Sequence, residues 1–153
     1  SMNGTIKLLG LLMLFAACCC GGFSKAARLS ARKRTLEELL ECLDELDARL
    51  RYEGTERLRL LREAFGKSGI IVFDDGAVRP NRRALPAEDL QPLEGLLDTF
   101  GSGDTAAEHN KIMLCRRLSE ARLRAAENDC AVLGRLYRAL GACAGAACCL
   151  ILI

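Results

Sequence analysis

The chain has 153 residues, of which 50% are hydrophobic and 27% are charged, and its formal net charge is +2. This length fits one domain, and the apolar content excludes a disordered chain. Acidic residues alternate with most of the basic ones, so no global positive field selects a nucleic acid as partner.

The first predicted element is an uncharged apolar run at residues 8–23, flanked by Lys7 and Lys25. The run is shorter than the ~20 residues that span a bilayer comfortably, but snorkelling lysines extend its reach. We therefore predict a retained transmembrane helix over residues 6–23. The basic residues that follow the run outnumber those before it: Lys25, Arg28, Arg32, Lys33 and Arg34. The positive-inside rule then places the next part of the chain in the cytoplasm.

Two alternatives stay open for this apolar run. One is a cleaved signal peptide. The other is a lipoprotein signal, because Phe15-Ala16-Ala17-Cys18 is a near match to a lipobox. In that case the mature chain begins at Cys18, carries lipid there, and has its domain outside the cytoplasm. The phenylalanine in place of the usual leucine and the apolar residues after Cys18 favour the retained helix.

Between the two apolar ends, the sequence predicts a cytoplasmic helical domain over residues 24–138. After Thr35, leucines recur at three- and four-residue steps, which is typical of an amphipathic helix: Leu36, Leu39, Leu40, Leu43, Leu46 and Leu50. Glu41 and Glu45 belong to its solvated face. Thr55 is expected to cap a short helix that ends at Gly66. The residues of this helix that we expect to face inward are Leu58, Leu61 and Phe65.

Residues 66–92 carry all three prolines and are expected to be the least regular part. The run Ile70-Ile71-Val72-Phe73, followed by Asp74-Asp75-Gly76, fits a short strand entering a turn and a buried helical turn equally well. Pro86 fits the first position of the next helix. The apolar stripe of that helix is Leu85, Leu90, Leu93, Leu97 and Phe100.

The last predicted helix begins near Thr105 and contains no proline. Thr105 and Glu108 fit a capping box. Charged residues stop at Arg138, and residues 139–153 are apolar, so we predict that the helix continues into a membrane as a second transmembrane segment. The buried stripe predicted for it is Ile112, Cys115, Leu118, Ala125, Leu133, Leu136 and Leu140.

Small residues near the end of this helix predict close helix packing in lipid. Gly141 and Gly145 form a GxxxG pattern, and we expect this face to pack against residues 16–22 of the first span. Tyr137 and Arg138 suit the membrane interface. The predicted fold class is all-α: a helical bundle domain flanked by two transmembrane helices, the last helix being long and continuous into the membrane.

No pattern in the sequence predicts catalysis. The nine cysteines include no CxxC pair, and packing is the expected role of each. The single histidine, His109, lies near Asp104 and Glu108, where an acid–base pair is conceivable and a surface histidine is the simpler interpretation. Nucleophile motifs, phosphate loops and dinucleotide fingerprints are absent from the sequence. We therefore expect no enzyme, no metal, no cofactor, no small-molecule substrate and no nucleic acid.

Four segments resemble the stage III sporulation protein AB family. They are Ile6-Lys7-Leu8-Leu9-Gly10, the helix end at residues 93–101, the Gly103-Asp104 turn, and the stretch from Tyr137-Arg138 through Leu140 and Gly141 to Gly145. The last is the most specific, since the family ends in a similar "YRxLGxxxG" before an apolar tail.

The resemblance implies a component of the assembly that connects mother cell and forespore in spore-forming bacteria. Family members have a helical cytoplasmic part similar to that of the type II secretion inner-membrane platform protein. Such a part docks a secretion-type ATPase and other membrane subunits, and does no chemistry. The expected location is the mother-cell or outer forespore membrane, in contact with its lipid. Arginines of the last helix are the candidate docking residues for an acidic partner: Arg116, Arg117, Arg122 and Arg124.

Overall fold

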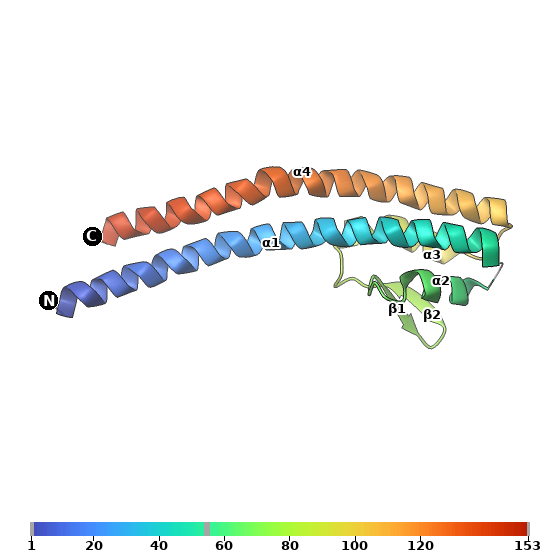
Figure 1. The fold of residues 1–153 in the computed structure, drawn as a ribbon, viewed down its shortest axis with the longest axis horizontal. Helices are drawn as coiled ribbons and strands as arrows, with labels where there is room; N and C mark the ends of the chain where they lie inside the picture. The colour runs from blue at the N-terminus through green and yellow to red at the C-terminus, as the bar shows by residue number, and fades with distance from the viewer. Residues whose placement is uncertain (1, 54–55, 153) are drawn as a thin grey trace. The chain divides into compact units, whose positions relative to one another are not determined.

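The computed structural model describes residues 2–53 and 56–152. Within them the elements follow in the order α1 (Met2–Glu53), α2 (Arg57–Phe65), β1 (Ile71–Asp74), β2 (Ala77–Pro80), α3 (Ala87–Thr99) and α4 (Thr105–Leu152) (Figure 1). The predicted helical class is confirmed, and a short hairpin is added to it. The expected cap Thr55 lies outside the described residues.

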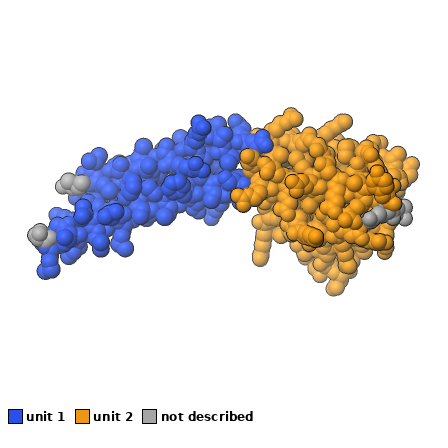
Figure 2. Space-filling view, in the orientation of Figure 1, with its two compact units in different colours: residues 1–31, 126–153 blue, residues 32–125 orange. Residues whose placement is uncertain are grey.

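The chain divides into two compact units (Figure 2). Unit 1 consists of residues 1–31 and 126–153, and unit 2 consists of residues 32–125. Helices α1 and α4 contribute residues to both units. Unit 2 falls inside the range 24–138 that the sequence predicts for the helical domain. Unit 1 contains both apolar ends of the chain, and each of its helices is long and apolar enough to cross a membrane.

In unit 1 the first part of α1 packs against the last part of α4. The thiol of Cys149 donates a hydrogen bond to the carbonyl oxygen of Leu11 at 3.6 Å. Further along, Ser30 Oγ lies 3.5 Å from Cys130 Sγ. The two helices therefore run antiparallel over this stretch, with the beginning of α1 beside the end of α4.

In unit 2 the leucine stripe of α1 forms the centre of the core. Leu36, Leu39, Leu43 and Leu46 are fully buried, Leu50 is almost so, and Leu40 is half-buried at the edge of the stripe. This confirms the prediction, because a stripe at three- and four-residue steps keeps one helix face toward the core. The predicted stripe of α3 is buried as well: Leu85, Leu90, Leu93, Leu97 and Phe100.

Two local predictions in this unit were wrong in detail, and α3 contains an internal proline. Leu58 is only half-buried, and Leu60 takes its place in the core beside Leu61. Pro86 is the N-cap of α3 rather than its first residue. Pro92 lies inside α3, although a proline nitrogen cannot donate to the carbonyl four residues earlier. Burial of the leucines on both sides of Pro92 offsets this lost hydrogen bond.

The alternatives for residues 70–73 are resolved in favour of a strand. Strand β1 pairs antiparallel with β2, in the register Ile71 with Pro80 and Asp74 with Ala77. Asp75 and Gly76 connect them, with φ angles of 43° and 86°. Positive φ at both central residues is the geometry of a tight hairpin turn that matches strand twist, which explains the Asp-Gly pair here.

The N-terminus of α4 differs from the predicted capping box by one residue. Asp104, not Thr105, caps the helix: its Oδ1 accepts a hydrogen bond from the Ala107 N–H at 2.8 Å. Glu108 accepts the Gly103 N–H instead, at 2.9 Å. These two bonds join different pairs of residues, so they satisfy two backbone donors at the start of α4 without forming the predicted capping box.

The buried stripe predicted for α4 was also partly wrong. Ile112 and Cys115 are buried as expected, and Leu133 is half-buried. Leu118, Ala125, Leu136 and Leu140 are exposed. Ser119 and Ala126 are buried in their place. Hydropathy favours the leucines, whereas the inward face of α4 carries small residues that permit a closer approach of its neighbours.

Candidate docking surface

A groove of about 750 Å³ lies between α3 and α4 in unit 2. Its apolar lining comes from Pro92, Gly95 and Leu96 on α3 and from Leu114, Leu118 and Ala121 on α4. Leu114 is 59% exposed and Leu118 is 47% exposed. Two leucines one turn apart thus present an apolar ridge to solvent, which offers contact area to a partner.

The four predicted docking arginines fall into two pairs. Arg116 donates to Asp44 at 2.7 Å and also bonds Glu120. Arg122 donates to Asp89 at 2.7 Å and forms an ion pair with Glu88 at 3.2 Å. These two guanidinium groups therefore have partners inside unit 2.

Arg117 and Arg124 are exposed, and no ion pair of theirs occurs within the described part of the chain. They lie seven residues apart on α4, so they share one side of the helix. The structure therefore brings Arg117 and Arg124 together on one free cationic face, and leaves Arg116 and Arg122 to internal contacts.

Asp89 is the most deeply buried charged residue of this surface, with 0% of its side chain exposed. Arg32 on α1 holds it with two bonds, Nε to Oδ2 at 2.6 Å and a terminal nitrogen to Oδ1 at 2.9 Å. Arg122 on α4 adds the third bond. Burial by itself raises the pKa of this carboxyl, but the bonds and charges of the two arginines outweigh it and lower the pKa below its ordinary value. The ionised carboxylate thus ties α1, α3 and α4 together.

The sequence analysis did not single out Asp89 or Arg32 as a pair. A signal for Asp89 was present, since it precedes Leu93 by four residues and so lies on the buried stripe of α3. An acid on such a stripe requires an opposite charge from another element. One arginine that supplies this charge, Arg32, lies 57 residues away on another helix. The sequence alone does not reveal that pairing.

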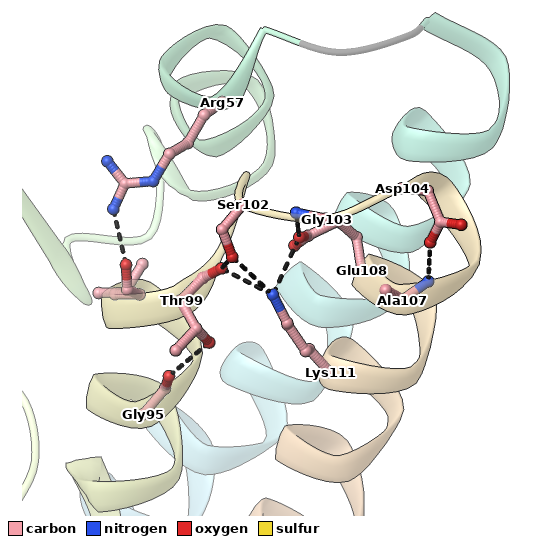
Figure 3. Close-up of polar contacts among 10 residues, drawn as sticks. Arg57, Gly95, Thr99, Ser102, Gly103, Asp104, Ala107, Glu108 and Lys111 are labelled. Atoms are coloured by element: carbon pink, nitrogen blue, oxygen red, sulfur yellow. Dashed lines mark hydrogen bonds and ion pairs between the residues drawn. The ribbon is translucent and has the colours of Figure 1, made fainter.

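The turn before α4 is held by a second polar cluster (Figure 3). The ammonium of Lys111 reaches Glu108 at 3.1 Å and also the Thr99 carbonyl and Ser102 hydroxyl. Burial raises the pKa of Glu108, while backbone donors of Gly101 and Gly103 together with Lys111 outweigh it and lower the pKa overall. Arg57 ties α2 to the same end of the unit by donating to the Leu97 carbonyl at 2.6 Å.

The candidate acid–base histidine contacts a different partner from those expected. His109 Nδ1 forms a short hydrogen bond with Asp47 on α1, not with Asp104 or Glu108. Its side chain is 31% exposed. Arg51 also approaches the ring, at 3.4 Å. This arrangement joins α1 to α4 at the surface of unit 2.

All nine cysteines are free. Cys42 and Cys115 are buried in unit 2. Burial raises the pKa of Cys115 to about 11, so almost none of this thiol is ionised at neutral pH. Within the described residues, no group of three metal-ligating side chains gathers.

In unit 1 the residues of the predicted motif meet the first helix. Tyr137 lies beneath the Lys25 ammonium, 5.0 Å from ring centroid to nitrogen. A Cβ atom added to Gly141 would lie 2.9 Å from the Cys18 carbonyl oxygen, and one added to Gly145 would meet the Phe15 ring. Arg138 and Leu140 are exposed. The glycines thus contact α1 at Cys18 and Phe15.

Comparison with known proteins finds one protein family that this chain matches. A family model described as stage III sporulation protein AB matches residues 7–69 and 77–153. The matched residues cover both units, and the unmatched stretch takes in β1 and the hairpin turn. No curated protein and no solved structure matches the chain.

Proposed function

The chain belongs to the stage III sporulation protein AB family, and we propose that it is a non-enzymatic, membrane-anchored scaffold of a secretion-like channel complex. Membership of the family makes it a sporulation protein. The scaffold role, the partners and the orientation are the proposal. In it, the apolar ends span the mother-cell or outer forespore membrane, and unit 2 faces the cytoplasm.

The observation that carries this proposal is the exposed groove between α3 and α4. Its apolar ridge, Leu114 and Leu118, has on its helix the two arginines that lack an internal ion pair, Arg117 and Arg124. Neither arginine lines the groove, and both lie on the adjoining side of α4. A protein partner is large enough to contact both, and the apolar part would supply affinity while the charge supplies selection. A small-molecule site would need convergent polar groups, and this groove is mainly apolar.

The proposed occupant of this groove is the secretion-type ATPase of the same complex, through an acidic face. The other membrane subunits are proposed to contact the transmembrane helices within the bilayer. Charge complementarity supports the choice, since acidic side chains beside an apolar helix face would pair with Arg117 and Arg124. The two internally paired arginines would keep α4 fixed to α1 and α3 while the partner binds.

The test reverses the two free charges in the full chain, as Arg117→Glu with Arg124→Glu. We expect loss of ATPase co-purification and of spore formation. The matched control reverses Arg82 and Arg83, which are also exposed and lie in the loop after the hairpin. Unchanged ATPase recruitment by the α4 variant would remove the proposed docking surface.

A second pair of variants tests the apolar ridge separately from the charges. Leu118→Asp places a carboxylate in the groove and is expected to abolish recruitment. Tyr52→Asp, at a residue that is 88% exposed, is the control and should bind normally.

The orientation of the chain needs a separate experiment. Single cysteines placed after residue 23 and before residue 139 in a cysteine-free chain would test it. Labelling of both only from the cytoplasm is expected.

A further inference from the structure

Four basic side chains of unit 1 lie next to the apolar ends of the chain. They are Lys25 and Arg28 on α1 and Arg135 and Arg138 on α4, and we call them the basic collar. All four are exposed. The stretches that carry them, residues 21–31 and 130–141, contain no aspartate or glutamate. The collar therefore has four positive charges and no acidic side chain beside them in sequence.

Two contacts between α1 and α4 show that the collar residues of the two helices lie at the same height along the helix pair. Lys25 covers Tyr137, and Ser30 meets Cys130. Because the helices are antiparallel, these two contacts align Arg28 with the turn just before Arg135. With a rise of about 1.5 Å per residue, the four charges occupy roughly 6 Å along the helix pair, about one turn. They form a belt and not a long basic stripe.

The four cations have no carboxylate partner within the described part of the chain. The Lys25 ammonium lies over the Tyr137 ring, a contact that leaves its charge available to an anion. Arginine matches the oxygens of a phosphate with two parallel hydrogen bonds, and lysine adds a point charge. The chemistry of the collar therefore fits phosphate groups.

We propose that the basic collar binds the phosphate headgroups of anionic phospholipids in the leaflet that it faces. The inference rests on the membrane anchoring in the proposed function. The apolar runs at residues 8–23 and 139–153 end directly at the collar, so its charges lie at headgroup depth. Lipids surround a helix pair on every side. Each of the four side chains can therefore contact a headgroup, even if the four do not lie on one face of the pair.

The test measures lipid selectivity of the full chain reconstituted in phosphatidylcholine vesicles. Electron paramagnetic resonance reports the fraction of spin-labelled lipid that the protein immobilises. Phosphatidylglycerol is expected to be preferred over phosphatidylcholine by roughly threefold to fivefold, the effect of about one basic residue near each headgroup. The collar variant, with Lys25, Arg28, Arg135 and Arg138 each changed to glutamine, should lose this preference.

The matched control also removes four exposed positive charges, but from unit 2. Lys67, Arg79, Arg82 and Arg83 are changed to glutamine, and the preference should persist. Equal immobilisation of both lipids by the unaltered chain would overturn the proposal, as would a preference that survives in the collar variant. Immobilisation of neither lipid would overturn the membrane anchoring itself, and the collar with it.

Two solutes, NaCl and inorganic phosphate, test the proposal on the unaltered chain, so this part does not depend on the folding of any variant. Raising NaCl from about 0.1 M to about 1 M shortens the screening length from about 10 Å to about 3 Å, and should weaken the preference. A preference unaffected by this change would overturn the electrostatic assignment. Inorganic phosphate at equal ionic strength should do no more than NaCl. A stronger effect of phosphate would mean a site for free phosphate instead of lipid.

Discussion

Gly22 on α1 and Gly141 on α4 face each other in unit 1, and a Cβ atom built on either would lie 3.5 Å from the Cα of the other. The same atom on Gly22 would lie 2.5 Å from the Tyr137 carbonyl oxygen. Such a distance is a clash with backbone, which cannot move aside as a flexible side chain can. The absence of side chains here lets the two helices approach closely, as small residues do in membranes.

Gly22→Ala is therefore expected to destabilise the chain. The added methyl group clashes with the α4 backbone, and overpacking of this kind costs about 1–3 kcal/mol in the free energy of unfolding. Gly21→Ala is the matched control, since a Cβ there meets nothing within 4 Å. Alanine has the higher helix propensity, so the control should unfold at the same temperature or higher. Circular dichroism of the full chain in detergent would measure both, and equal midpoints would contradict the clash.

Removing the carboxylate of Asp89 should destabilise unit 2 strongly. In Asp89→Ala, Arg32 and Arg122 lose a shared buried partner, and breaking such a pair costs about 3–5 kcal/mol. The control is Asp44→Ala, because the Asp44 side chain is 53% exposed and an exposed pair contributes about 0–1 kcal/mol. Urea unfolding of both variants gives the two free energies of unfolding. Similar values would mean that the buried carboxylate contributes no more than an exposed one.

The Asp89 carboxylate should also make the free energy of unfolding depend on pH in acid. The pKa of Asp89 is lower in the folded chain than its ordinary value, so the folded state binds this proton less readily than the unfolded state. Its contribution is therefore complete above the unfolded pKa, about 3.9, and is lost as the pH falls through the lower folded value. Urea midpoints measured below about pH 5 should fall less steeply for Asp89→Asn than for the unaltered chain. Parallel curves would contradict this assignment.

His109 distinguishes a scaffold from an enzyme. Its ring bonds Asp47 at the surface of unit 2 and lines none of the groove between α3 and α4. His109→Gln keeps a hydrogen-bonding group at this position, and we expect spore formation close to that of the unaltered chain. Counting heat-resistant spores measures the outcome. Loss of spores while the variant protein accumulates normally would favour a chemical role for the histidine.

The first span should remain attached to the chain. Phe15 packs against Gly145 and Cys18 against Gly141, so processing at Cys18 would remove Phe15 from a contact in unit 1. Mass spectrometry of the membrane-extracted protein is expected to find the residues before Cys18 present and no acyl chain. A mass that begins at Cys18 and includes lipid would establish the lipoprotein alternative and place the domain outside.

Much of the helical architecture follows from local patterns. Leucines at three- and four-residue steps identify the buried face of α1, and the turn at Asp75-Gly76 needs backbone geometry that few residue pairs adopt. The four residues before this turn remained ambiguous, because so short an apolar run suits a strand and a helix alike. Pairing with residues 77–80 made them a strand.

The sequence by itself determined the two apolar ends, the family and most of the helices, since these depend on composition and on spacing along one chain. It did not reveal that the first span and the leucine-striped segment after Thr35 form one continuous helix, α1. Tertiary structure alone decided which face of α4 is buried, because close packing selects Ser119 over the more hydrophobic Leu118, and Ala126 over the identical Ala125. It also decided which arginines are free. Arg116 and Arg122 pair with Asp44 and Asp89, whose positions depend on helices distant in sequence, and Arg117 and Arg124 point elsewhere on the same helix.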